Sequence, residues 1–169
     1  MKTHQITGHI GAEISEVDLR NLDDGQIASI RQAWLDHKVL VFREQNISRE
    51  QHIAFGLNFG DLEVHPFAPS PEDYPEIVKI ISNEKVQYAA SNWHSDVTWR
   101  QEPSMGSILR GRVIPDVGGD TSFANAAEAY KRLEPDVKAR VDSLYAIHDF
   151  SRTFGGRMSP EERQKKQEE

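Results

Sequence analysis

The sequence predicts an α+β fold that is mainly β, with short strands accompanied by surface helices. Short apolar runs of strand length recur along the chain, and segments with helical spacing of apolar residues lie between them. The regular β-α-β alternation of a doubly wound sheet is absent. At 169 residues the chain is expected to form a single domain, residues 1–169, and it is long enough to bury a core.

The first part of the chain is expected to contain two helices and one strand. Residues 21–38 carry apolar residues at helical spacing, with Asp23 or Asp24 as the expected N-cap. Residues 39–44, VLVFRE, form a short apolar run that predicts a buried strand. Residues 48–60 start with a serine that can cap a helix and end on a glycine, which predicts a second helix.

The remainder of the chain alternates loops, short strands and helical segments. Residues 65–75 hold four prolines and are expected to be a loop. Residues 126–144 are expected to form two helical segments broken at Pro135. Strands are expected at residues 76–82, 106–113 and 145–150, and after a turn within 117–125.

Composition excludes several functional classes. The formal net charge is −7 and no basic patch stands out, so a nucleic-acid partner is not expected. No apolar run approaches the ~20 residues of a membrane span, and no membrane partner is expected. The chain has no cysteine, which excludes disulfides, thiolate metal sites and thiol nucleophiles. The start lacks the layout of a signal peptide, so a cytoplasmic location is favoured.

His94 and Asp96, two residues apart within SNWHSDVTWRQEP, are the candidate pair for a metal site or for catalysis. If the segment is extended, the side chains of His94 and Asp96 point to the same face. That would supply two of the three ligands of a 2-His-1-carboxylate site for Fe(II). The spacing alone leaves a surface polar pair or a catalytic dyad open, and a zinc hydrolase is a further alternative that lacks other ligand spacing.

The surroundings of this pair extend the motif. Residues 92–96, NWHSD, are followed by Pro103, by the expected strand at 107–113, and by GGDT at 118–121. This arrangement closely resembles the taurine dioxygenase and 2,4-dichlorophenoxyacetate dioxygenase family of Fe(II)- and 2-oxoglutarate-dependent oxygenases. The resemblance covers nearly the whole chain, from VLVFREQNISREQ to the IHDF segment.

The resemblance implies a role for several residues. His94 and Asp96 would be iron ligands, and Thr121 would hydrogen-bond a carboxylate of the cosubstrate 2-oxoglutarate. His65 matches a histidine that lies in the substrate pocket of taurine dioxygenase, near the anionic head group. The alternative for His65 is a loop residue whose position is fixed by the proline that follows it.

The resemblance also bears on the substrate pocket. Asn92 and Trp93 would shape the pocket wall and pack behind the metal, and His148 would be structural rather than a third ligand. Where taurine dioxygenase has a tyrosine and an asparagine, this chain has Ala68 and Ala90. Both differences remove hydrogen-bonding reach, which makes taurine doubtful and favours a larger or more apolar acid.

The family fold is a double-stranded β-helix, or jelly roll, with flanking helices, and its last strands complete both sheets. The family's second iron-binding histidine and the arginine that pairs with 2-oxoglutarate lie in that C-terminal part. No residue after Met158 can supply either of them, and SPEERQKKQEE is nearly devoid of apolar side chains. The jelly roll is therefore expected to be incomplete, with the chain truncated at its C-terminal end.

The function implied is hydroxylation of a C–H bond next to an anionic group by Fe(II), 2-oxoglutarate and O₂. A sulfonate or sulfate ester would then collapse to an aldehyde with release of sulfite or sulfate, beside succinate and CO₂. One alternative is a family member acting on an aryloxy or other carboxylic acid. Another is a non-catalytic binding protein, if the truncation is genuine. Family members often associate, so a homo-oligomer stays open.

Overall fold

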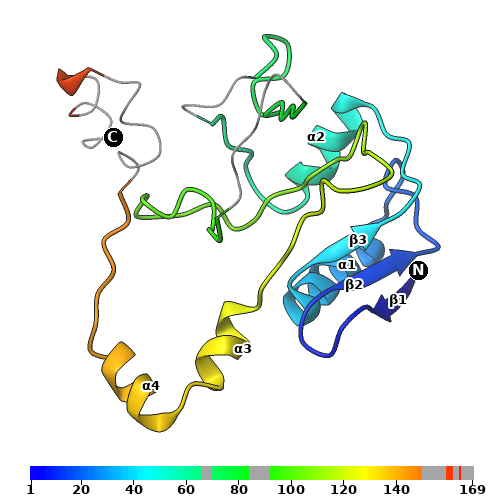
Figure 1. Ribbon diagram of the computed structural model, residues 1–169. Coiled ribbons are helices and arrows are strands. Elements are labelled where there is room, and N and C mark those ends of the chain that lie inside the picture. The colour runs from blue at the N-terminus through cyan, green and yellow to red at the C-terminus, as the bar shows by residue number, and fades with distance from the viewer. Residues whose placement is uncertain (66–69, 84–91, 150–158, 162–163, 165–169) are drawn as a thin grey trace. The chain divides into compact units, whose positions relative to one another are not determined.

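The computed structural model describes residues 1–65, 70–83, 92–149, 159–161 and 164, and all structural statements below concern these residues. Its contacts divide the chain into two compact units. The first unit comprises Met1–Leu62 and Arg110–Leu144, and the second comprises Glu63–Leu109 and Tyr145–Glu169. The helices and strands that Figure 1 labels all belong to the first unit.

The sheet of the first unit has three strands in the order β1-β2-β3. Strand β1 (Lys2–Gln5) pairs with β2 (Ala12–Ser15) in antiparallel register, with Thr3 opposite Ile14. Strand β3 (Leu40–Phe42) pairs with β2 in parallel. Parallel neighbours require a crossover connection, and helix α1 provides it between β2 and β3 (Figure 1).

Both predicted N-terminal helices are confirmed, and each starts with a capping box. Helix α1 spans Asp24–His37; the Asp23 side chain accepts a hydrogen bond from the Gln26 backbone N–H, and the Gln26 side-chain oxygen accepts one from the Asp23 backbone N–H. Helix α2 spans Arg49–Leu57, with Ser48 and Gln51 paired in the same way. Each cap satisfies backbone donors that the first helical turn leaves free.

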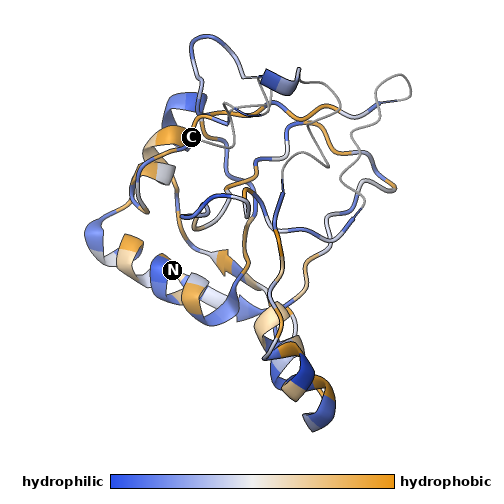
Figure 2. Ribbon diagram, turned by 90° about the vertical axis from the view of Figure 1, so that its left-hand side faces the viewer, coloured by the Kyte–Doolittle hydropathy of each residue, from blue (hydrophilic) through white to orange (hydrophobic). Residues whose placement is uncertain are grey.

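The core lies between helices α1 and α2 and the sheet. Its buried cluster consists of Leu19, Ile30, Ile47 and Phe55, and half-buried side chains including Leu40 and Phe42 pack against it. Figure 2 shows hydrophobic and hydrophilic residues side by side along the helices, as expected for helices that cover a core with one face.

The strand expected at residues 39–44 forms, but it is shorter than expected and is not buried. Its three residues are all half-buried. The physical reason is its position, because β3 is the last strand in the order β1-β2-β3 and has a strand neighbour on one side only.

The two helical segments expected within residues 126–144 are confirmed as α3 (Ala126–Lys131) and α4 (Pro135–Val141). Pro135 occupies the first turn of α4, where its missing N–H costs no helical hydrogen bond. Neither helix buries a residue.

Helix α3 is tied to the turn that joins β1 and β2. Asn125 caps the helix and its Nδ2 donates to the His9 carbonyl at 2.7 Å. The Arg132 guanidinium lies 3.0 Å from the His9 Nε2 and donates to Glu128 at 2.7 Å. Polar contacts, rather than buried apolar side chains, thus hold α3 to the N-terminal hairpin.

Four predicted strands are wrong for the part of the chain that the structure describes. Residues 76–82, 106–113, 117–125 and 145–149 contain no strand, and residue 150 lies outside the described ranges. Apolar side chains in these segments are exposed, including Ile80, Ile108, Val113 and Ile147. An apolar run forms a strand only when another strand pairs with it, and none of the described strands pairs with these segments.

Among the helices that could be searched, none is both long and apolar enough to cross a membrane.

Candidate metal centre

His94 and Asp96 lie close together in the second unit, as predicted from their spacing. The His94 Nε2 is 3.4 Å from the Asp96 Oδ1, and both side chains are more than half exposed. The local backbone differs from the prediction, because Asp96 starts a turn that runs to Trp99 instead of continuing a strand. The two side chains converge through this turn rather than through the alternation of an extended segment.

A second contact fixes the histidine ring. The His94 Nδ1 lies 2.8 Å from the backbone carbonyl oxygen of Asn92. A carbonyl can only accept, so this ring nitrogen carries the proton and donates it. In a neutral imidazole the Nε2 lone pair is then free and faces the Asp96 carboxylate. Metal-binding histidines are characteristically oriented through their other ring nitrogen in this way.

The pair fits a divalent metal ion. In neutral His94, the Nε2 and the Asp96 Oδ1 are both acceptors and cannot hydrogen-bond each other. Atoms that each bind a metal at about 2.1 Å are about 3.0 Å apart at a right angle and about 3.4 Å apart at the tetrahedral angle. The observed 3.4 Å lies at the upper end of that range. Imidazole nitrogen and carboxylate oxygen are also the donor set of a non-haem Fe(II) site.

The pair supplies two ligands and no more. Within the described ranges, no group of three or more His, Cys, Asp or Glu side chains could hold a metal ion. A third ligand is therefore not identified in the described part of the chain.

The backbone at the pair is strained. Val97 has a φ of +45°, a conformation that is a genuine outlier for a β-branched residue. Its side chain is 4% exposed, so burial holds it there. Strain of this kind costs of the order of 1–3 kcal/mol and concentrates at functional sites. The strained residue directly follows Asp96, where it sets the direction of the turn.

The remaining predicted site residues are placed as follows. His65 is half-buried in a loop of the second unit. Thr121 is exposed and belongs to the first unit, where it follows Gly118 and Gly119. These glycines have φ values of +80° and +74°, which agrees with the predicted turn because glycine adopts such values without strain. Ala68 lies outside the described residues.

Two further expectations concern the neighbourhood of the His94–Asp96 pair. Asn92 contributes its backbone carbonyl to the His94 ring. Trp93 is 73% exposed, so the expectation that it packs behind the metal is wrong; in the described structure its indole is largely in solvent. Ala90 also lies outside the described residues. The His148 Nδ1 is 2.8 Å from the Thr98 hydroxyl, so its ring contacts the turn that starts at Asp96.

Sequence reasoning did not identify Ser107 as a site residue. Its hydroxyl donates to the Asp96 Oδ2 at 2.9 Å, across 11 positions of sequence. Serine is too common in loops for the residue type to have signalled this contact, which depends on how the chain returns after the turn.

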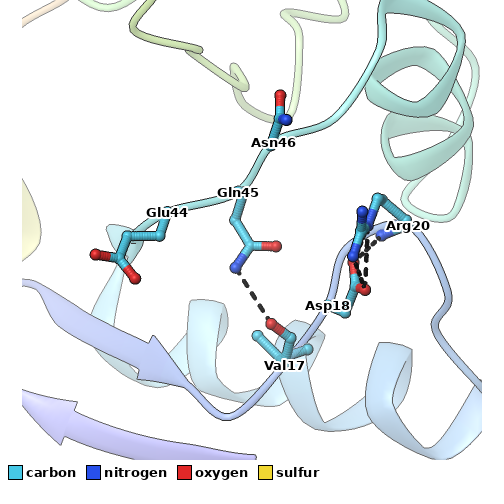
Figure 3. A pocket seen from close by; sticks show the side chains of 6 residues that line it. All are labelled: Val17, Asp18, Arg20, Glu44, Gln45 and Asn46. Carbon is cyan, nitrogen blue, oxygen red and sulfur yellow. Dashed lines mark hydrogen bonds and ion pairs between the residues drawn. The ribbon is translucent and has the colours of Figure 1, made fainter.

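A polar cavity of about 230 Å³ lies in the first unit (Figure 3). Gln45 spans it, since its Nε2 donates to the Val17 carbonyl at 3.2 Å and its Oε1 accepts from the Leu19 N–H at 3.0 Å. Beside it, the Arg20 Nε and Nη2 donate to the two Asp18 carboxylate oxygens at 2.9 and 2.7 Å. Gln45 thereby joins the loop that follows β3 to the loop that follows β2, whereas Asp18 and Arg20 pair within the loop that follows β2.

The Asp18–Arg20 pair yields a pH prediction. Hydrogen bonds from the Arg20 side chain and backbone N–H lower the pKa of Asp18 from 3.8 to about 2. The native state thus favours the carboxylate, and its stabilisation is present above pH ~4 and is lost as the pH falls toward 2. We expect Arg20→Ala to return the Asp18 midpoint toward 3.8, measured by NMR titration of the carboxyl carbon. An unchanged midpoint would contradict the assignment, and Arg20→Lys should be intermediate.

Comparisons with known proteins identify the family of the chain. Residues 2–169 match the family described as "Taurine catabolism dioxygenase TauD, TfdA family". The chain is 37% identical to the (S)-phenoxypropionate/alpha-ketoglutarate-dioxygenase of Sphingobium herbicidovorans, over 83% of this chain and 50% of that protein. It is 36% identical to an alkylsulfatase of Acinetobacter baylyi, over 92% of this chain and 49% of that protein.

The chain is also similar to a solved structure. The taurine dioxygenase from Burkholderia xenovorans superimposes with a TM-score of 0.78 at 40% identity, covering 88% of this chain and 53% of the other. The chain thus spans about half the length of the relatives it matches. The chain belongs to the TauD/TfdA family.

Proposed function

We propose that this chain contributes the His-x-Asp part of the iron site of a 2-oxoglutarate-dependent dioxygenase. The observation that carries the proposal is the distance of 3.4 Å between His94 Nε2 and Asp96 Oδ1, with the His94 Nδ1 2.8 Å from the Asn92 carbonyl oxygen. Family membership supports the identity of the metal. The bound metal, together with 2-oxoglutarate and O₂, would supply the oxidation of a C–H bond with release of succinate and CO₂.

The proposed tasks of the chain's own residues are binding and orientation. The Asn92 carbonyl holds a ring proton on the His94 Nδ1, which leaves Nε2 as the nitrogen that would bind the ion. Asp96 supplies the negative charge that partly neutralises the ion. Thr121 would hydrogen-bond a carboxylate of 2-oxoglutarate, and His65 and Asn92 would line the substrate pocket. Residues 1–169 would form one catalytic domain of the jelly-roll type.

The proposed substrate is a small anionic molecule, with the hydroxylated carbon next to a sulfonate or sulfate ester group. Hydroxylation there gives a product that releases sulfite or sulfate and leaves an aldehyde. The similarity to an alkylsulfatase supports this class. The similarity to a phenoxypropionate dioxygenase favours an aryloxy acid as the second candidate.

The test uses residues 1–169 and a fusion in which they replace the matching part of the Burkholderia xenovorans taurine dioxygenase. Succinate is measured with Fe(II), 2-oxoglutarate, O₂ and one of three substrates: an alkyl sulfate, an aryloxypropionate or taurine. We expect the fusion to form succinate in a substrate-dependent way, most with the alkyl sulfate and least with taurine. Greatest turnover with the aryloxypropionate would select the second candidate. A folded fusion that turns over 2-oxoglutarate normally after His94→Ala would refute the ligand assignment.

A further inference from the structure

The hydrogen bond from Ser107 engages one oxygen of the Asp96 carboxylate. The Ser107 hydroxyl lies 2.9 Å from Oδ2, whereas Oδ1 is the atom that faces the His94 Nε2 at 3.4 Å. The two carboxylate oxygens thus have different partners. Burial does not enforce this orientation, because 60% of the Asp96 side chain is exposed.

We propose that Ser107 is a positioning residue that holds Asp96 so that only its Oδ1 binds the metal ion. The inference rests on the proposed function, since it presumes a metal ion between His94 and Asp96. A hydroxyl has a single proton to donate, and Ser107 directs it to Oδ2. Metal binding through that oxygen would have to compete with the hydrogen bond.

The number of carboxylate oxygens on the metal decides how many positions stay open. A carboxylate can bind a metal through one oxygen or through both. Binding through Oδ1 alone, together with one imidazole nitrogen, uses two positions. Binding through both oxygens would use three and would remove a position from the cosubstrate or from O₂. Ser107 therefore protects an open position without touching the metal.

The second consequence concerns affinity. A ligand that is already oriented loses less freedom when the metal binds, and residues that orient metal ligands contribute about 10–100-fold in metal affinity. Ser107 is well placed for this because it lies 11 residues beyond Asp96 and reaches it from a separate stretch of chain. The turn of Asp96 and the segment around Ser107 are held together by the same bond.

The test measures Mn(II) binding by the 169-residue chain without any turnover. Mn(II) is titrated into the chain, and broadening of the His94 ring signals in the NMR spectrum gives the dissociation constant even when binding is weak. We expect Ser107→Ala to weaken binding about 10–100-fold. Ser107→Thr keeps a hydroxyl and is expected to restore most of the affinity. Ser104→Ala is the matched control, because it removes a hydroxyl from the same segment that donates to Glu63 instead.

A second measurement separates orientation from general structural support. The infrared difference spectrum between metal-loaded and metal-free chain reports how the bound carboxylate coordinates. We expect one-oxygen coordination in the wild type and in Ser107→Thr, and a shift toward two-oxygen coordination in Ser107→Ala. Wild-type affinity in Ser107→Ala, or an unchanged carboxylate spectrum, would overturn the positioning role. Mn(II) binding that survives both His94→Ala and Asp96→Asn would instead overturn the proposed metal site itself.

Discussion

Replacement of His94 by alanine is expected to abolish Mn(II) and Fe(II) binding at the His94–Asp96 pair. The imidazole Nε2 is one of only two ligands identified in the described part of the chain, so its loss leaves a single exposed carboxylate. The effect should exceed the 10–100-fold expected for a residue that only orients a ligand. Isothermal titration calorimetry of the 169-residue chain with Mn(II) measures it, and succinate formation by the fusion should fall to the background level.

Two variants make this result specific. Asp96→Asn retains an oxygen that can accept from Ser107 but removes the charge, so binding should be greatly weakened while the turn is kept. His4→Ala is the matched control, because it removes an exposed histidine from β1 in the other unit and should leave the titration unchanged. Full Mn(II) affinity in His94→Ala would mean that the metal binds elsewhere, and the interpretation of the pair as ligands would fail.

The helices could be predicted from the sequence because their signals are local. Asp23 and Ser48 cap α1 and α2 together with partners three residues later in the sequence. The signal for each helix start therefore lies within four consecutive residues. Pro135 likewise marks the start of α4. These predictions needed no knowledge of the remaining chain, and the structure confirms them.

The strands were predicted poorly because pairing is not local. Strands β1 and β2 were not predicted at all: β1 is KTHQ, a polar run with every residue exposed, and it forms through its register with β2. The reverse error occurred at residues 106–113, where an apolar run has no described neighbour to pair with. Strand propensity describes how well a residue fits a sheet, and the sheet must be supplied by another segment.

The candidate site could be predicted in part. His94 and Asp96 were found because a short motif carries both, and the structure brings them together. The orientation of each side chain could not be predicted, because it depends on a backbone carbonyl at Asn92 and a hydroxyl at Ser107. Such partners belong to common residue types, and only the three-dimensional path of the chain selects them.

The largest expected effect on stability is that of Phe55→Ala. The Phe55 side chain is 5% exposed and lies in the buried cluster of the first unit. Its ring packs edge-on against Phe42 at 5.9 Å and against Phe59 at 5.3 Å between centroids. Truncation leaves a cavity and removes both ring contacts, so we expect a loss of about 3–5 kcal/mol in the free energy of unfolding. Urea denaturation followed by circular dichroism measures it.

Because a small domain has only about 5–15 kcal/mol of stability in total, Phe55→Ala could leave the first unit largely unfolded. Phe55→Leu keeps most of the volume and should give a smaller, measurable loss in the same direction. Leu57→Ala is the matched control, since it lies on the same helix with a side chain that is 56% exposed, and it should change the free energy by less than about 0.5 kcal/mol. If Phe55→Ala lowered the free energy of unfolding no more than Leu57→Ala, the packing of Phe55 against Phe42 and Phe59 would not be what holds α2 against β3.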